Sequence, residues 1–155
     1  MTARILVAGV GNVFLGDDGF GVEVARRLLC DPPPGAQVVD YGIRGLHLAY
    51  ALLEGCDLLI AVDAMPRGQP PGTLYVLEPG EVDALPPIAA EGHGMNLPAV
   101  FALVRQLGGT LPRIRIVGCE PASVDERMGL GEEVAAVVPQ AESLVRRLVE
   151  AHRES

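Results

Sequence analysis

An apolar segment that passes into a glycine-rich turn and then an acidic pair opens the chain, at residues 5–21 (ILVAGVGNVFLGDDGFG). This order predicts a buried strand, a tight turn and the start of a helix. Dinucleotide-binding units open in the same way, with backbone amides and a helix N-terminus holding a pyrophosphate. Asp17 and Asp18 would repel a phosphate strongly in a partly dry site. Carboxylates at a strand end suit a cation better, so the segment favours a cation site in an α/β fold.

The rest of the chain alternates strand and helix patterns. We predict strands at residues 4–8, 37–40, 57–64, 73–78 and 113–118, and helices at 18–29, 44–53, 97–107 and 132–152. In the second helix, Leu46, Tyr50 and Leu53 recur at helical spacing. The β-α-β-α-β order implies right-handed crossovers and a parallel core. If the first strand lies between the second and third, a crevice opens at the carboxyl ends of the first and third strands. The loop before 73–78 is too short for a helical crossover, so this strand could run antiparallel at one side.

Composition narrows the class of protein. The 155 residues suffice for one domain, 1–155, and 49% hydrophobic with only 4% aromatic residues suits a sheet covered by helices. The net charge of −8 makes nucleic acid and anionic membrane poor partners. Three scattered cysteines fit a reducing compartment. No signal peptide precedes the first strand, and no apolar run could span a membrane. We therefore expect a soluble cytoplasmic protein.

Three side chains could meet at the predicted crevice. Asp63 ends a wholly apolar strand, Asp18 stands at a helix start, and His93 lies between two glycines in the long irregular span 79–96. Each has an ordinary explanation when taken alone: a loop cap, a helix cap and a solvated loop histidine. Together, two carboxylates and one imidazole form a ligand set that leaves coordination positions open for water or substrate.

Two other residues suggest alternative functions for the protein. Cys119 follows the last strand and could act as a thiol nucleophile with His93, although a small buried cysteine is far commoner at such a place. Asp40 ends the second strand, where dinucleotide-binding proteins place the acid that binds ribose. The glycines at 9, 11 and 16 are spaced two residues too widely for that motif. Asp40 could instead form a wall of the crevice beside Arg44.

Short motifs also occur in a fixed order along most of the chain. They are GVGN at 9–12 with LGDDGFG at 15–21, DYGIRG at 40–45, IAVDA at 60–64, PGT at 71–73, His93 with Leu97, and VGCEP at 117–121 leading to GL at 129–130. In this combination they resemble the hydrogenase maturation endopeptidases, which trim the large subunit of nickel–iron hydrogenases. One such motif would be weak evidence, whereas an ordered series is much more specific.

The resemblance implies a three-layer α/β/α sandwich with a mostly parallel, mixed five-stranded sheet. It implies that the metal-contact and catalytic residues are Asp18, Asp63 and His93. Many relatives carry Glu at the first position, so the shorter Asp leaves open whether Asp17 or Asp18 points inward. The implied activity is removal of a short C-terminal extension from a hydrogenase large-subunit precursor whose nickel is already installed. The nickel then comes with the substrate, and no permanently bound cofactor is expected.

Two alternatives remain beside this function. A nickel-sensing protein without catalytic activity would bind the precursor and metal but release no peptide. A dinucleotide-binding module would use residues 9–16 and Asp40, against the charge of Asp17 and Asp18. In the peptidase reading, the metal or a carboxylate beside it polarises the scissile carbonyl and activates water.

Overall fold

The computed structural model describes residues 4–83 and 96–155. Five strands form one sheet in the order β2-β1-β3-β5-β4. They are β1 (Ile5–Val10), β2 (Ala36–Gly42), β3 (Leu58–Ala64), β4 (Leu74–Leu77) and β5 (Arg113–Cys119). All neighbours are parallel except β4, which pairs antiparallel with β5. The predicted mostly parallel, mixed sheet is confirmed, as are the central position of β1 and the antiparallel direction of β4.

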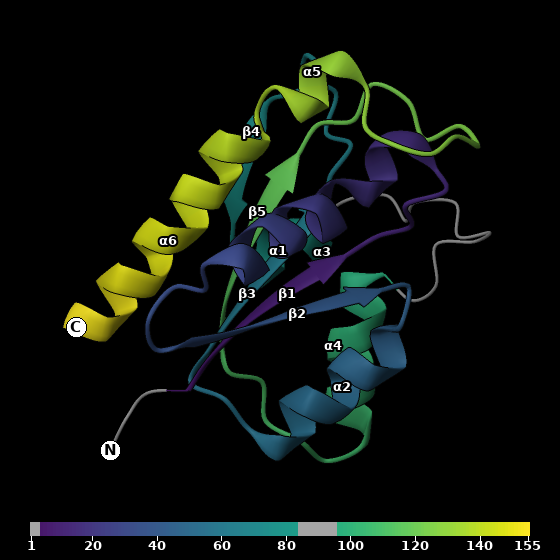
Figure 1. Ribbon diagram of the computed structural model, residues 1–155. Coiled ribbons are helices and arrows are strands. Elements are labelled where there is room, and N and C mark those ends of the chain that lie inside the picture. The colour runs from purple at the N-terminus through teal and green to yellow at the C-terminus, as the bar shows by residue number, and fades with distance from the viewer. Residues whose placement is uncertain (1–3, 84–95) are drawn as a thin grey trace.

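Helices cover both faces of the sheet. They are η1 (Gly16–Gly19), α1 (Phe20–Cys30), α2 (Gly45–Glu54), α3 (Pro79–Asp83), α4 (Leu97–Gln106), α5 (Glu132–Ala135) and α6 (Val138–Glu154). On one face α1 packs beside α6, and on the other α2 packs beside α4 (Figure 1). Two apolar cores fill the space between these pairs and the sheet, so the architecture is the α/β/α sandwich that the resemblance implied. None of the helices within the described residues is long and apolar enough to cross a membrane.

Glycines bring α1 unusually close to the sheet. A Cβ on Gly21 would lie 2.0 Å from the carbonyl oxygen of Val62 and 2.4 Å from that of Val10. A Cβ on Gly9 would lie 2.3 Å from the carbonyl oxygen of Gly21. Only residues without side chains permit this approach. Because α1 begins directly against β1 and β3, the preceding η1 turn lies at the carboxyl edge of the sheet, where it contacts β3.

Some helix boundaries differ from the predictions. The first helix was expected to begin at Asp18, but a separate 3₁₀ turn, η1, holds residues 16–19 and α1 begins at Phe20. The span 79–96 is not wholly irregular, because α3 occupies its first residues. The single helix predicted at 132–152 is two helices, α5 and α6. Pro139 lies in the first turn of α6, where a proline is tolerated but cannot continue an earlier helix.

The helix predicted at 44–53 is confirmed as α2, but two of the residues whose spacing indicated it do not face the core. Leu46 is 44% exposed and Tyr50 is 52% exposed, whereas Leu48, Ala49 and Leu52 face the core. Apolar residues occupy nearly every position of this helix, so the spacing of any one set could not identify the buried stripe. The rotation of α2 depends instead on its packing against α4.

Candidate active site at the carboxyl edge of the sheet

The structure places Asp63 and Asp18 at one edge of the sheet, and both are buried, with exposed fractions of 2% and 1%. Asp63 is the next-to-last residue of β3. Because side chains alternate along a strand and Leu59 and Ala61 pack under α2 and α4, Asp63 belongs to that same face. Asp18 lies in η1, which contacts β3. Two carboxylates that are far apart in sequence therefore lie on neighbouring elements.

Asp18 belongs to the turn that follows β1. Its Oδ2 accepts a hydrogen bond of 2.8 Å from the backbone N–H of Asn12. The Asn12 side chain in turn accepts one of 2.9 Å from the N–H of Phe14. A Cβ on Gly11 would lie 1.9 Å from the carbonyl oxygen of Asp18, so the turn closes tightly around this acid.

Asp17 has a different set of partners. Its Oδ2 accepts hydrogen bonds from the N–H groups of Ala122 (2.7 Å) and Ser123 (3.1 Å), and its Oδ1 accepts one from Gly131 (2.7 Å). Both oxygens thus hold the loop 121–131 against η1. This arrangement favours Asp18 over Asp17 as the acid that could bind a metal, which stays a prediction.

The role of Asp17 can be measured as stability. We expect Asp17→Asn to lower the free energy of unfolding by about 3 kcal/mol, because an amide cannot accept all three N–H groups and its own NH₂ opposes one of them. Urea denaturation checks this value. Asp125→Asn, an exposed acid in the same loop, is the matched control and should change stability by less than about 0.5 kcal/mol. Equal effects of the two variants would contradict the assignment.

His93 lies outside the described residues, so the structure does not test its position. The next described residue is Asn96, whose side chain caps α4 by accepting a hydrogen bond of 2.9 Å from the N–H of Ala99. This end of α4 lies at the carboxyl edge of the sheet, because α4 runs back along the sheet before β5 (Figure 1). Among residues 4–83 and 96–155, no three His, Cys, Asp or Glu side chains lie close enough to hold a metal ion.

A further buried carboxylate, Glu120, lies directly after β5, and the sequence pattern did not indicate it as a site residue. Glu120 is 5% exposed, and its Oε1 accepts hydrogen bonds from the N–H groups of Arg67 (2.7 Å) and Gln69 (3.1 Å) and from the hydroxyl of Tyr75 (2.7 Å). Burial acts to raise the pKa of Glu120, but these hydrogen bonds outweigh it and lower the pKa. Burial and the bond to Glu120 raise the pKa of Tyr75 to about 12. Glu120 therefore fixes the loop that follows Asp63.

Cys119 is buried without solvent exposure in β5. Burial, followed by the nearby charges of Asp17 and Glu120, raises the pKa of its thiol to about 12. The nucleophile in thiol chemistry is the thiolate, which such a group does not form near neutral pH. The alternative of a Cys119 nucleophile is therefore disfavoured, and the cysteine acts as a small core residue.

A groove of about 330 Å³ lies at the carboxyl ends of β1 and β2. Asp40 and Arg44 both line it, but the crevice predicted from the sequence lay at the ends of β1 and β3, and no residue of β3 lines this groove. Asp40 Oδ2 lies 3.5 Å from Nε of Arg26, and Arg44 donates to the backbone carbonyls of Asp40 and Tyr41. These contacts hold Asp40 and Arg44 in place. Asn12 also lines the groove, and because its backbone N–H donates to Asp18, the groove lies next to that acid.

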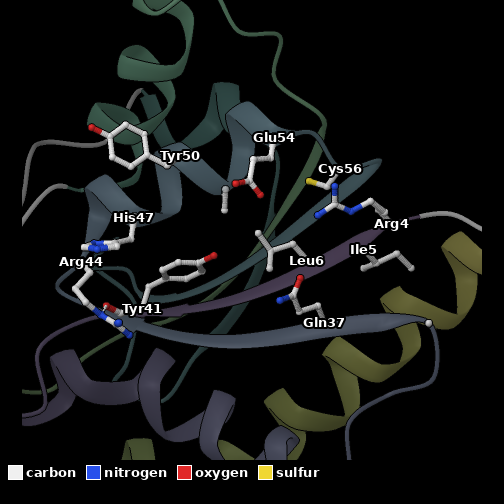
Figure 2. A pocket seen from close by; sticks show the side chains of 12 residues that line it. Arg4, Ile5, Leu6, Gln37, Tyr41, Arg44, His47, Tyr50, Glu54 and Cys56 are labelled. Carbon is white, nitrogen blue, oxygen red and sulfur yellow. Dashed lines mark hydrogen bonds between the residues drawn. The ribbon is translucent and has the colours of Figure 1, made fainter.

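A larger hollow, of about 460 Å³, lies between α2 and the strands β1 and β2. Figure 2 shows the side chains of Tyr41, Glu54 and Arg4 around it. Tyr41 and Arg44 line both hollows, which are therefore neighbours. Neither Asp18 nor Asp63 is among the residues that line either hollow. The two candidate acids are therefore associated with the sheet edge and not with these two hollows.

The chain is similar in sequence to known proteins. A family model described as hydrogenase maturation protease matches residues 22–148. The hydrogenase 2 maturation protease of Escherichia coli (strain K12) is 30% identical over 154 residues, which cover 98% of this chain and 92% of that protein. The hydrogenase expression/formation protein HupD of Rhodobacter capsulatus is 32% identical over 129 residues, 81% of this chain; the match spans only 61% of that longer relative.

Solved structures show the same fold. The hydrogenase maturating endopeptidase HybD from E. coli superposes with a TM-score of 0.81 at 32% identity, covering 96% of this chain and 93% of that one. The nickel–iron hydrogenase maturation protease HycI from Thermococcus kodakarensis KOD1 superposes with a TM-score of 0.74 at 26% identity, over 96% and 93% of the two chains.

Proposed function

Because the chain belongs to the hydrogenase maturation protease family, we propose that it is an endopeptidase that removes a C-terminal extension from the large-subunit precursor of a nickel–iron hydrogenase. The family membership confirms the resemblance carried by the ordered motifs. The observation that supports this activity most directly is the placement of two buried carboxylates, Asp18 and Asp63, on neighbouring elements at one edge of the sheet.

The proposal assigns nickel recognition to Asp18, Asp63 and His93. The nickel is part of the substrate: it is already installed in the precursor, and these side chains add carboxylate and imidazole ligands to it. Nickel accepts both ligand types. Docking of the metal would hold the C-terminal tail of the precursor at the sheet edge, next to the groove that Asp40 and Arg44 line. The proposal requires no permanently bound cofactor.

Hydrolysis then needs an activated water. The nickel polarises the scissile carbonyl, and a carboxylate beside it accepts a proton as the water oxygen bonds to the carbonyl carbon. When the C–N bond breaks, the proton passes to the leaving amine. Cys119 is not needed as a nucleophile, in keeping with its raised pKa.

A cleavage assay tests the proposal. A hydrogenase large-subunit precursor, nickel-loaded and nickel-free in parallel, is incubated with the protein, and mass spectrometry measures the mass of its C-terminus. We expect loss of the extension from the loaded form only. Pretreating the protein with a chelator, then removing the chelator, should leave the rate unchanged, because the metal comes with the substrate. Equal cleavage of both forms would contradict nickel recognition. Binding of the loaded precursor without cleavage would favour the nickel-sensing alternative.

The dinucleotide-binding alternative is weakened by the turn after β1. In such a site the backbone N–H groups of the glycine-rich turn hold phosphate oxygens. Here the N–H of Asn12 donates to the carboxylate of Asp18. The Asp18 carboxylate therefore already accepts the hydrogen bond that the Asn12 N–H would have to donate to a phosphate.

A further inference from the structure

The sheet brings Asp63, Gly118 and Tyr75 into one row across β3, β5 and β4. In the strand register, Asp63 and Tyr75 each lie opposite Gly118, on its two sides. All three belong to the face covered by α2 and α4, because the neighbours two positions away in these strands, Ala61, Ile116 and Leu77, are part of that core. Adjacent strands lie about 4.8 Å apart, so Tyr75 lies roughly 10 Å from Asp63 along the row.

Arg67 is held above the far end of this row. Its guanidinium carbon lies 5.5 Å from the centroid of the Tyr75 ring, within the range of a cation–π contact. The Tyr75 hydroxyl donates to Glu120, which also accepts from the backbone N–H of Arg67. One buried carboxylate thus fixes both the backbone of Arg67 and the aromatic ring beneath its guanidinium. The arginine is held in one position before any ligand binds.

The guanidinium lacks the partner that such a group normally has. Its Nη1 is buried, yet this atom has no hydrogen-bond partner among the residues that the structure describes. Within residues 4–83 and 96–155, no carboxylate forms an ion pair with the guanidinium; Glu120 is bonded to the backbone of Arg67 instead. A buried donor without an acceptor is costly, and more so when it carries charge. In a chain of net charge −8, a cation kept in this condition points to an acidic ligand.

We infer that Arg67 binds a carboxylate of the substrate peptide, about three residues from the scissile bond. This inference rests on the proposed function, which places cleavage beside Asp63. An extended peptide advances about 3.3 Å per residue, so roughly 10 Å corresponds to three residues. The planar guanidinium fork matches a carboxylate with two parallel hydrogen bonds. The carboxylate is either the C-terminus of the extension or an acidic side chain within the precursor tail.

Cleavage kinetics on the nickel-loaded precursor test the inference. Arg67→Met keeps the apolar stem and removes the charge, so we expect KM to rise roughly 10- to 100-fold, with kcat changed less than about twofold. Arg67→Lys should recover only part of the loss, because an ammonium cannot form the paired hydrogen bonds. Arg105→Met, which removes an exposed arginine from α4, is the matched control for net charge and should leave KM unchanged. An unchanged KM for Arg67→Met would overturn the inference.

Changes to the substrate identify the carboxylate without relying on a variant enzyme. A precursor with an amidated C-terminus, and a second precursor with the acids of its tail changed to amides, are each cleaved by the wild-type protein and by Arg67→Met. The precursor that lacks the bound carboxylate should raise KM for the wild type but not for Arg67→Met. If neither precursor raises the wild-type KM, the inference is wrong. If the wild type cleaves no loaded precursor at all, the proposed function has failed instead.

Discussion

Asp63→Asn is expected to abolish processing of the nickel-loaded precursor while the protein stays folded. The substitution keeps the shape of the side chain but removes the negative charge that would bind nickel or accept a proton. Loss of a positioned acid–base group lowers rates by roughly 10²- to 10⁴-fold, and loss of a metal ligand should be at least as severe. The measurement is kcat/KM for loss of the C-terminal extension, with circular dichroism and the urea midpoint showing that the fold is kept.

Asp57→Asn is the matched control for this variant. Asp57 stands just before the opposite end of β3, where it accepts a hydrogen bond from the backbone N–H of Arg4. Both variants replace an aspartate by asparagine beside or within β3, but Asp57 lies at the amino edge of the sheet. We expect the Asp57→Asn protein to cleave the precursor at the wild-type rate. If Asp63→Asn cleaved the precursor at a rate within tenfold of wild type, Asp63 would not be a catalytic or nickel-binding residue.

Gly21→Ala should have the largest effect on stability. The new Cβ would lie 2.0 Å and 2.4 Å from two backbone oxygens, those of Val62 and Val10, and neither atom can rotate away as a side chain could. Helix α1 must therefore move off the sheet and open the core around it. We expect a loss of at least about 3 kcal/mol, more than ordinary overpacking costs because the clash is with backbone. Urea denaturation measures it.

Gly80→Ala separates this steric effect from the general effect of replacing a helical glycine. Gly80 lies in α3, and no atom of the described residues lies within 4 Å of the position that a Cβ would take. Alanine is a better helix former than glycine by about 1 kcal/mol, so this variant should be neutral or slightly more stable. If both variants unfolded at the wild-type midpoint, the close packing of α1 would not be a source of stability.

The strands could be predicted from the sequence because buried parallel strands are continuous apolar runs with clear ends. The run that forms β3 ends in an acid, and the run that forms β1 ends in a glycine turn. The side-by-side packing of the helices could not be predicted in the same way. In α2 apolar residues point in every direction, so only contact with α4 decides that Leu48 is buried and Tyr50 is not. Local pattern predicts an element, whereas tertiary packing sets its rotation.

The candidate site shows a similar division. The sequence identified Asp18 and Asp63 as acids at a sheet edge, but it could not distinguish Asp17 from Asp18, because the distinction comes from N–H groups more than 100 residues away. The cluster of Glu120, Tyr75 and Arg67 could not be predicted from the sequence either, because its contacts also join residues that are far apart in the chain. Its members lie on three segments whose meeting depends on the antiparallel pairing of β4 with β5. The available signal was an acid at the end of an apolar run, which Glu120 shares with Asp63.

The hydrogen bonds of Asp17 also bear on when activity can first appear during synthesis of the chain. They join residues separated by 105, 106 and 114 positions. Contacts of such separation form late in folding, because a long stretch of chain must be ordered before they can close. A nascent chain that still lacks residues 121–131 cannot secure the η1 turn that carries Asp18. A ribosome-bound fragment would therefore have no assembled site, and an enzyme that cuts peptide bonds would acquire its activity only after residues 121–131 have been synthesised.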